Sequence, residues 1–159
     1  MKIFLSILFL SLIIYSHVYN FQQKILYISV DTFNLLPSSD ESVVVSFGKN
    51  DNDFHAFAIK KKDIKQGVEL LSKSKNNPNF SVFGDVKGEA LVRSEQLETF
   101  AKVKVLSVDK KNQRAVFLVE ANLFNMSSKE LNKLDITKVI VKGELFLKLM
   151  EQQSIPKIS

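Results

Sequence analysis

Few residues of this chain have side chains suited to acid–base or nucleophilic chemistry. Cysteine is absent and there are two histidines, of which His17 lies beside an expected leader, leaving His55 as the candidate. General acid–base catalysis most often uses His or a carboxylate with a shifted pKa. His55 shares an expected strand face with Phe57 and Ile59, which favours a partly buried, hydrogen-bonded ring over a catalytic one. We therefore expect no catalytic residue, no metal site and no enzyme.

Two short polar runs could be read as ligand sites. Asp51-Asn52-Asp53, with Asp40 and Glu41, offers oxygen ligands for calcium, but the twelve-residue spacing of an EF-hand loop is absent. Asp and Asn also favour turns between strands, so we expect a turn there. The run Gly84 to Glu89 has two glycines but opens no expected helix, so it does not predict a phosphate-binding loop. We expect no cofactor.

Two asparagines begin sequences that a eukaryotic cell can glycosylate. Asn79-Phe80-Ser81 and Asn125-Met126-Ser127 both match the acceptor pattern. Matches arise by chance in a chain rich in Asn and Ser. The sequence leaves open whether the source is bacterial or eukaryotic, and hence whether either site is used.

The start of the chain has the three-part pattern of a signal peptide. Met1-Lys2 is followed by an uncharged apolar run, Ile3 to Ile14, and then by polar residues, with Ser16 as the expected cleavage position. The alternative is an uncleaved anchor, although Ile3 to Val18 would span only about 24 Å as a helix, short of a ~30 Å hydrocarbon core. Residues 1–18 therefore predict an extracytoplasmic protein, periplasmic or secreted, or one tethered to a membrane if the leader stays.

The remaining chain has the composition of one globular domain. Of the 159 residues, 45% are hydrophobic and 25% are charged, and the formal net charge is +5. We expect a single domain over residues 21–150 and a flexible tail over 151–159. The one dense basic run, Lys60 to Lys62 with Lys65, is typical of a solvated face, with weak attraction to anionic lipid or glycan as the alternative. Export argues against nucleic acid as a partner.

Most of the domain alternates between apolar and polar residues with a period of two, which is typical of strands. The runs expected to form strands are 25–30, 42–47, 54–59, 80–93, 101–105, 115–123 and 138–150. The second and third are expected to pair as one hairpin, and the fifth and sixth as another. Gly84 and Gly88 inside the long fourth run predict a bend or a close approach of another backbone.

One segment has helical spacing. Ile64, Val68 and Leu71 fall at i, i+4 and i+7, so residues 62–75 predict an amphipathic helix. Short helical turns are expected at 94–97 and 127–134, where Ser127 and Glu130 have capping-box spacing. The fold class is therefore mainly β, with α+β as the rival. We expect a curved antiparallel sheet or a small β-barrel of about seven strands with one inserted helix.

Four phenylalanines on the expected strands are the candidate binding residues. Phe80, Phe83, Phe117 and Phe124 could line a cavity beside the glycine-bent strand. The leading hypothesis is an exported, non-enzymatic binding module for a lipid-like or other apolar ligand. One alternative is an interaction or structural protein of the envelope or surface. Another is a glycan-acting enzyme, which would need two carboxylates ~5–9.5 Å apart in a cleft.

Overall fold

The structure, a computed structural model, describes residues 25–31, 41–73 and 76–151. The expected leader (1–18) and almost all of the expected tail (151–159) lie outside these residues. The described chain forms nine strands, one short 3-10 helix and one α-helix. The strands are β1 (Tyr27–Asp31), β2 (Ser42–Asn50), β3 (Asp53–Lys60), β4 (Glu69–Ser72), β5 (Phe80–Val86), β6 (Glu89–Val92), β7 (Phe100–Asp109), β8 (Arg114–Asn125) and β9 (Leu131–Lys142), and the helices are η1 (Lys61–Asp63) and α2 (Glu144–Met150).

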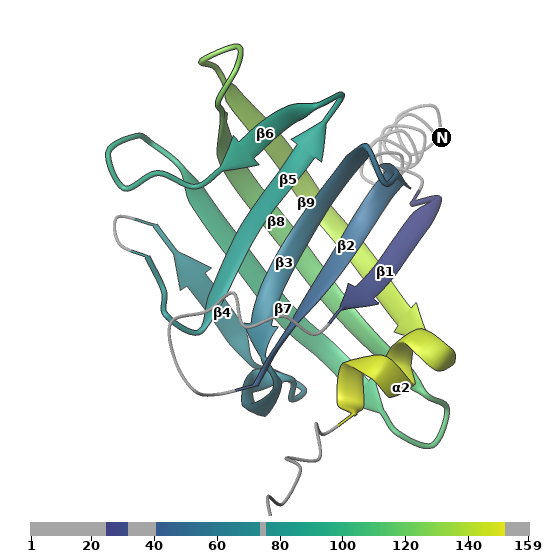
Figure 1. The fold of residues 1–159 in the computed structure, drawn as a ribbon. Coiled ribbons are helices and arrows are strands. Elements are labelled where there is room, and N and C mark those ends of the chain that lie inside the picture. Colours follow the sequence, from purple (N-terminus) through teal and green to yellow (C-terminus); the bar gives the residue numbers. More distant parts are fainter. Residues whose placement is uncertain (1–24, 32–40, 74–75, 152–159) are drawn as a thin grey trace, which may run out of the picture.

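The strands form one antiparallel sheet that folds into two layers (Figure 1). One layer holds β1, β2, β3, β5 and β6, and the other holds β4, β7, β8 and β9. The layers are continuous because β6 pairs with the end of β8, with Leu91 opposite Asn125. Within the described residues the sheet does not close, since β1 pairs only with β2 and β4 only with β7. The expected mainly β, curved antiparallel sheet is confirmed, as an open sheet with more strands than expected.

Two expected hairpins are confirmed. β2 pairs with β3 across a turn at Asp51-Asn52, in which the Asn50 side chain accepts a hydrogen bond from the Asn52 amide at 2.9 Å. β7 pairs with β8 along almost its whole length, with Val103 opposite Val119. Alternating apolar residues predicted β7 and β8, whereas β2 and β3 were predicted from short apolar runs on either side of a polar turn, and these two strands bury residues of both faces.

The expected long strand over 80–93 is instead a hairpin of β5 and β6. Lys87 and Gly88 both have positive φ, as the tight turns that suit a hairpin require, and the Asp85 carboxylate accepts the Gly88 amide at 2.8 Å. The expected close approach does occur at Gly84. A Cβ there would lie 2.7 Å from the carbonyl oxygen of Phe54 on β3.

The expected helix over 62–75 is wrong. Of the described residues in this range, those of η1, Lys61–Asp63, are helical, and Gly67 then adopts a φ of +87° that an α-helix does not contain. After Gly67 the burial alternates, with Val68 and Leu70 packed against the core while Leu71 is exposed. A period of two at Val68, Leu70 and Ser72 thus competes with the helical spacing, and pairing with β7 decides for the strand β4.

The α-helix lies where the last strand was expected to continue. β9 ends at Lys142, Gly143 turns the chain with a φ of +61°, and α2 follows. Phe146 and Leu149 of α2 are buried, with Leu145 and Met150 packed beside them. The short helix expected over 127–134 is also wrong, because β9 already begins at Leu131.

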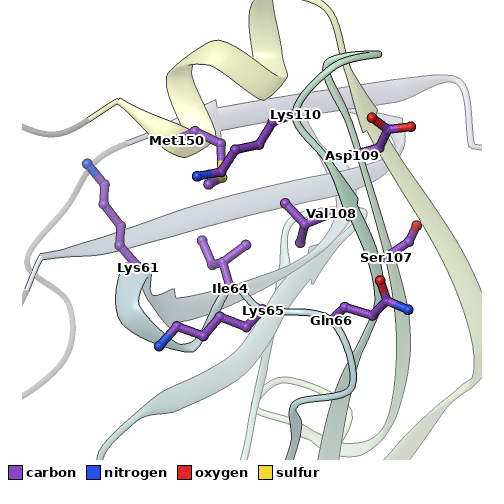
Figure 2. A pocket seen from close by; sticks show the side chains of 9 residues that line it. All are labelled: Lys61, Ile64, Lys65, Gln66, Ser107, Val108, Asp109, Lys110 and Met150. Carbon is purple, nitrogen blue, oxygen red and sulfur yellow. The ribbon is translucent and has the colours of Figure 1, made fainter.

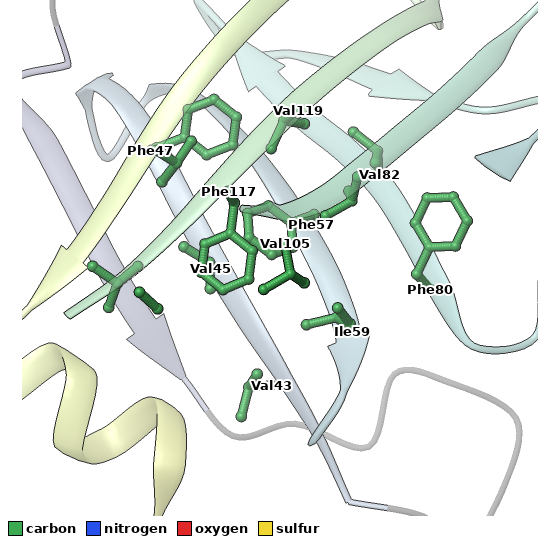
Figure 3. Close-up of a cluster of buried hydrophobic side chains, with 14 of the residues drawn as sticks. Val43, Val45, Phe47, Phe57, Ile59, Phe80, Val82, Val105, Phe117 and Val119 are labelled. Carbon is green, nitrogen blue, oxygen red and sulfur yellow. The ribbon is translucent and has the colours of Figure 1, made fainter. Parts of the chain in front are cut away.

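The core lies between the two layers. The inward residues of both layers are fully buried, and Phe57 on β3 packs on Phe117 on β8 with ring centroids 5.0 Å apart. Phe47 on β2 extends this aromatic group, 6.3 Å from Phe57 (Figure 3). Packing of this kind holds the ends of β3 and β7, which carry the site described next.

Candidate functional site

A pocket opens at the end of the molecule where β3 and β7 finish. It has a volume of about 880 Å³ and is lined by residues from η1 and the loop after it, from the β7–β8 corner, and from the last turn of α2 (Figure 2). The lining residues are Lys61, Ile64, Lys65, Gln66, Ser107, Val108, Asp109, Lys110 and Met150. Small-molecule sites usually occupy ~300–1,000 Å³, so this volume is in the range of a binding site.

The floor of the pocket is apolar. Ile64 is only 4% exposed and belongs to the main core. Val108 and Met150 are half-buried and pack against that core. In Figure 2, Ile64 and Val108 occupy the middle of the pocket, between the surrounding polar side chains. A ligand with an apolar part could therefore extend the core's own packing.

The rim of the pocket is cationic. The Lys61 ammonium is already engaged, since it lies 3.1 Å from the Glu41 carboxylate and donates to the Glu151 carbonyl oxygen. In the described part of the chain, the ammonium groups of Lys65 and Lys110 have no hydrogen-bond or ion-pair partner. Two lysines that form no ion pair with any described residue thus stand beside an apolar floor, with the Asp109 carboxylate also in the lining.

Asp109, the carboxylate in the lining, is held by the β7–β8 turn. Its oxygens accept hydrogen bonds from the Asn112 amide at 3.0 Å and the Asn112 side chain at 2.7 Å. These bonds, the side-chain one first, lower the pKa of Asp109 and favour its ionised form. In Figure 2 its carboxylate points away from Ile64. Among the described residues Asp109 is the one carboxylate that lines the pocket, and glycan hydrolysis would need two.

The four phenylalanines proposed from the sequence do not share one face. Phe80 and Phe117 point into the core and are 2% and 0% exposed. Phe83 lies on the outer face of its layer beside Ala56 and Ala58. Phe124 also alternates outward, where the Lys129 ammonium lies 6.0 Å from its ring centroid. The structure brings none of the four to the pocket.

His55 lies far from the pocket, near the start of β3. Its ring is buried and stacks on Phe47 with centroids 6.2 Å apart, and none of the described residues forms a hydrogen bond with its Nε2. Burial lowers the pKa of His55, although a side-chain hydrogen bond with Asn132 and the charge of Asp53 act in the opposite direction. The ring is therefore buried and hydrogen-bonded, as expected, and Nε2 is the nitrogen that has no partner among the described residues.

The remaining sequence candidates are structural. Asp51 to Asp53 form the β2–β3 turn, and the described residues contain no group of three or more carboxylate or histidine side chains that could hold a metal ion. The Asn125 nitrogen that would carry a glycan donates to the Glu89 carboxylate at 2.7 Å, and Asn125 is 7% exposed. A glycan there would break this contact, whereas Asn79 is half-buried.

Helical segments of membrane-crossing length and apolarity are not found among the residues that the structure describes.

Sequence reasoning did not assemble the pocket because its residues come from three distant segments. Lys61 and Lys65 belong to the basic run noted above, which was the available signal. The sequence contains no signal that points to Lys110 or Met150, since their positions depend on the β7–β8 turn and on α2. Comparison of the chain with protein-family models, with curated proteins and with solved structures finds no match.

Proposed function

We propose that this protein is an exported, non-enzymatic binding module that holds a lipid-like or other apolar ligand in the pocket between η1, the end of β7 and Met150. The observation that carries the proposal is the joining of an apolar floor, Ile64, Val108 and Met150, to the main core at an open pocket of about 880 Å³. A soluble ligand with an apolar part gains free energy by covering such a floor.

The leader pattern supports the export part of the proposal. A short basic start, an uncharged apolar run and a polar boundary are what a secretory signal needs. Outside the cytoplasm, apolar molecules need a carrier or a membrane. A small sheet protein with an apolar pocket suits the first of these roles.

Native mass spectrometry of the protein recovered from its own host tests the proposal. We expect a mass above that of the chain, which disappears on denaturation, together with an extractable apolar molecule. Replacing Met150 by Glu should abolish the added mass, because an apolar ligand that covers the carboxylate would remove its water at a large cost in free energy. Leu147→Glu is the matched control on the same helix, since Leu147 is 51% exposed and does not line the pocket.

An empty protein that also fails to bind apolar probes in titration would overturn the proposal. That outcome would favour the alternative, an interaction or structural protein of the envelope or surface.

A further inference from the structure

We infer that the ligand is an anionic amphiphile whose charged headgroup lies between Lys65 and Lys110 and whose apolar chain covers Ile64, Val108 and Met150. This inference rests on the proposed function and specifies the chemical class that the pocket selects.

The two free lysines select for charge. Lys65 follows η1 and Lys110 begins the β7–β8 turn, so they reach the pocket from different elements (Figure 2). Each ammonium offers three N–H donors and, among the described residues, neither has an acceptor. A carboxylate, sulfate or phosphate group carries a negative charge and has lone pairs that can accept hydrogen bonds from both ammonium groups.

Among the described residues no carboxylate forms an ion pair with either lysine, although the charge of Asp109 remains in the lining. The Asp109 carboxylate is bound by Asn112, and the Glu41 carboxylate is bound by Lys61. The lining as a whole holds three lysines and one aspartate, a formal charge of 3 − 1 = +2. An anionic ligand would therefore enter a positive local potential, and a cationic one would be repelled.

The arrangement of charge and apolar surface matches a single-chain amphiphile. Charged groups stand on the rim, in contact with water, and apolar side chains form the floor. A headgroup at the rim keeps most of its hydration while the chain loses contact with water. A small free anion would use the rim alone, and a neutral lipid the floor alone, so an anionic amphiphile is the class that uses both.

The anionic headgroup could belong to a free amphiphile or to a lipid in a bilayer. Four further cations, Lys111, Arg114, Lys142 and Lys148, are exposed on β8, β9, α2 and the turn before β8, against the two exposed carboxylates of Glu144 and Glu151. These cations could also meet an anionic membrane surface. The shared chemistry is the anionic headgroup, and the experiment separates the two sources.

Isothermal titration of the protein, processed as its host processes it and freed of bound lipid, tests the inference. The probes are dodecanoate and the uncharged undecyldimethylamine oxide, which carry the same eleven-carbon alkyl chain, both below their micellar concentrations. We expect dodecanoate to bind about tenfold more tightly, since each exposed ion pair changes affinity by roughly two- to fivefold. In the double variant Lys65→Gln/Lys110→Gln this preference should vanish while affinity for the amine oxide stays unchanged.

The matched control is the double variant Lys49→Gln/Lys87→Gln. Both residues are exposed lysines at the opposite end of the sheet, Lys49 near the end of β2 and Lys87 in the turn between β5 and β6. The variant has the same net charge as Lys65→Gln/Lys110→Gln, and it should keep the tenfold preference. Equal loss in both variants would mean that net charge alone attracts the anion, and would overturn the inference.

Sedimentation with vesicles identifies the source of the headgroup. Phosphatidylcholine vesicles with and without phosphatidylglycerol are the probes. Dodecanoate binding assigns the headgroup to a free amphiphile. The headgroup belongs to a bilayer lipid if dodecanoate does not bind, vesicle binding requires phosphatidylglycerol, and the variant Lys65→Gln/Lys110→Gln loses that binding. Equal affinity for dodecanoate and the amine oxide overturns the inference but keeps the proposed function. Binding of none of these probes overturns both.

Discussion

The rings of Phe57 and Phe117 pack 5.0 Å apart, centroid to centroid, and join the two layers of the sheet. Phe57 belongs to β3 in one layer and Phe117 to β8 in the other, and both are fully buried. Tilted aromatic pairs add to the free energy gained by burial alone. This contact joins β3 to β8 across the core.

Replacing Phe117 by Ala should lower the free energy of unfolding by about 3–5 kcal/mol, because a large buried side chain leaves a cavity. Urea unfolding followed by circular dichroism measures the change. Phe124→Ala, on the same strand but half-buried on the outer face, should cost only about 1 kcal/mol. Similar losses in the two variants would contradict the assignment of Phe117 to the core.

His55 should make the protein less stable in mild acid. Burial lowers its pKa in the folded state below the ordinary value of 6.5. The unfolded chain therefore takes up the proton first, and stability falls as pH drops from about 6.5 towards the lowered pKa. Above about pH 7 the effect is absent. Urea midpoints between pH 5 and 8 should show this slope, and it should flatten in His55→Phe. An unchanged slope in that variant would assign it to other groups.

Gly84→Ala should destabilise the protein by about 1–3 kcal/mol, because the added methyl group would lie 2.7 Å from the Phe54 carbonyl oxygen and the strands would have to separate. Gly88→Asn is the control. Gly88 has open space around it and a positive φ that Asn tolerates, so the change should be small. Thermal unfolding of both variants measures the difference, and a tolerated Gly84→Ala would refute the close approach.

Arg93 should stabilise the segment before β5. Its guanidinium donates to the Asn76 side-chain oxygen at 2.6 and 2.8 Å and to the Lys73 carbonyl oxygen, and its side chain is 5% exposed. Arg93→Met should cost about 2 kcal/mol and speed amide hydrogen exchange at Asn76. Lys102→Met removes an exposed ion pair with Glu69 and should cost less than about 1 kcal/mol. Unchanged exchange at Asn76 would rule out this role.

Sequence reasoning predicted the elements whose pattern is local. Residues 101–105 of β7 alternate between apolar and polar residues, and every second residue of β8 from Ala115 to Leu123 is apolar, so their pairing followed from the printed residues. It failed where two periods coincide. Around Val68 both spacings fit, and the partner strand β7 decided between them. After Gly143 the alternation of Leu145, Leu147 and Leu149 continued the pattern of β9, although α2 is a helix.

The pocket could not be predicted in the same way. Its floor depends on Val108 and Met150, which lie about 40 residues apart along the chain and meet only through tertiary packing. The four phenylalanines were chosen for bulk and nearness to glycines. Neither property fixes which face of a strand a side chain lies on. Phe80 and Phe83 on β5 are three residues apart, and Phe117 and Phe124 on β8 are seven apart, so the period of two places the members of each pair on opposite faces.

The open edges of the sheet affect where the folded protein opens locally. α2 contacts both β1 and β9, two strands that form no ladder with each other in the described chain. That seam is held by side chains alone, so parting it breaks no ladder hydrogen bond, unlike parting β8 from β9. Opening that seam therefore costs less than opening a ladder. Met150 at the end of α2 also lines the pocket. A bound molecule that contacts Met150 would therefore hold α2 against β1 and β9, and proteases would cut the occupied protein more slowly near β1.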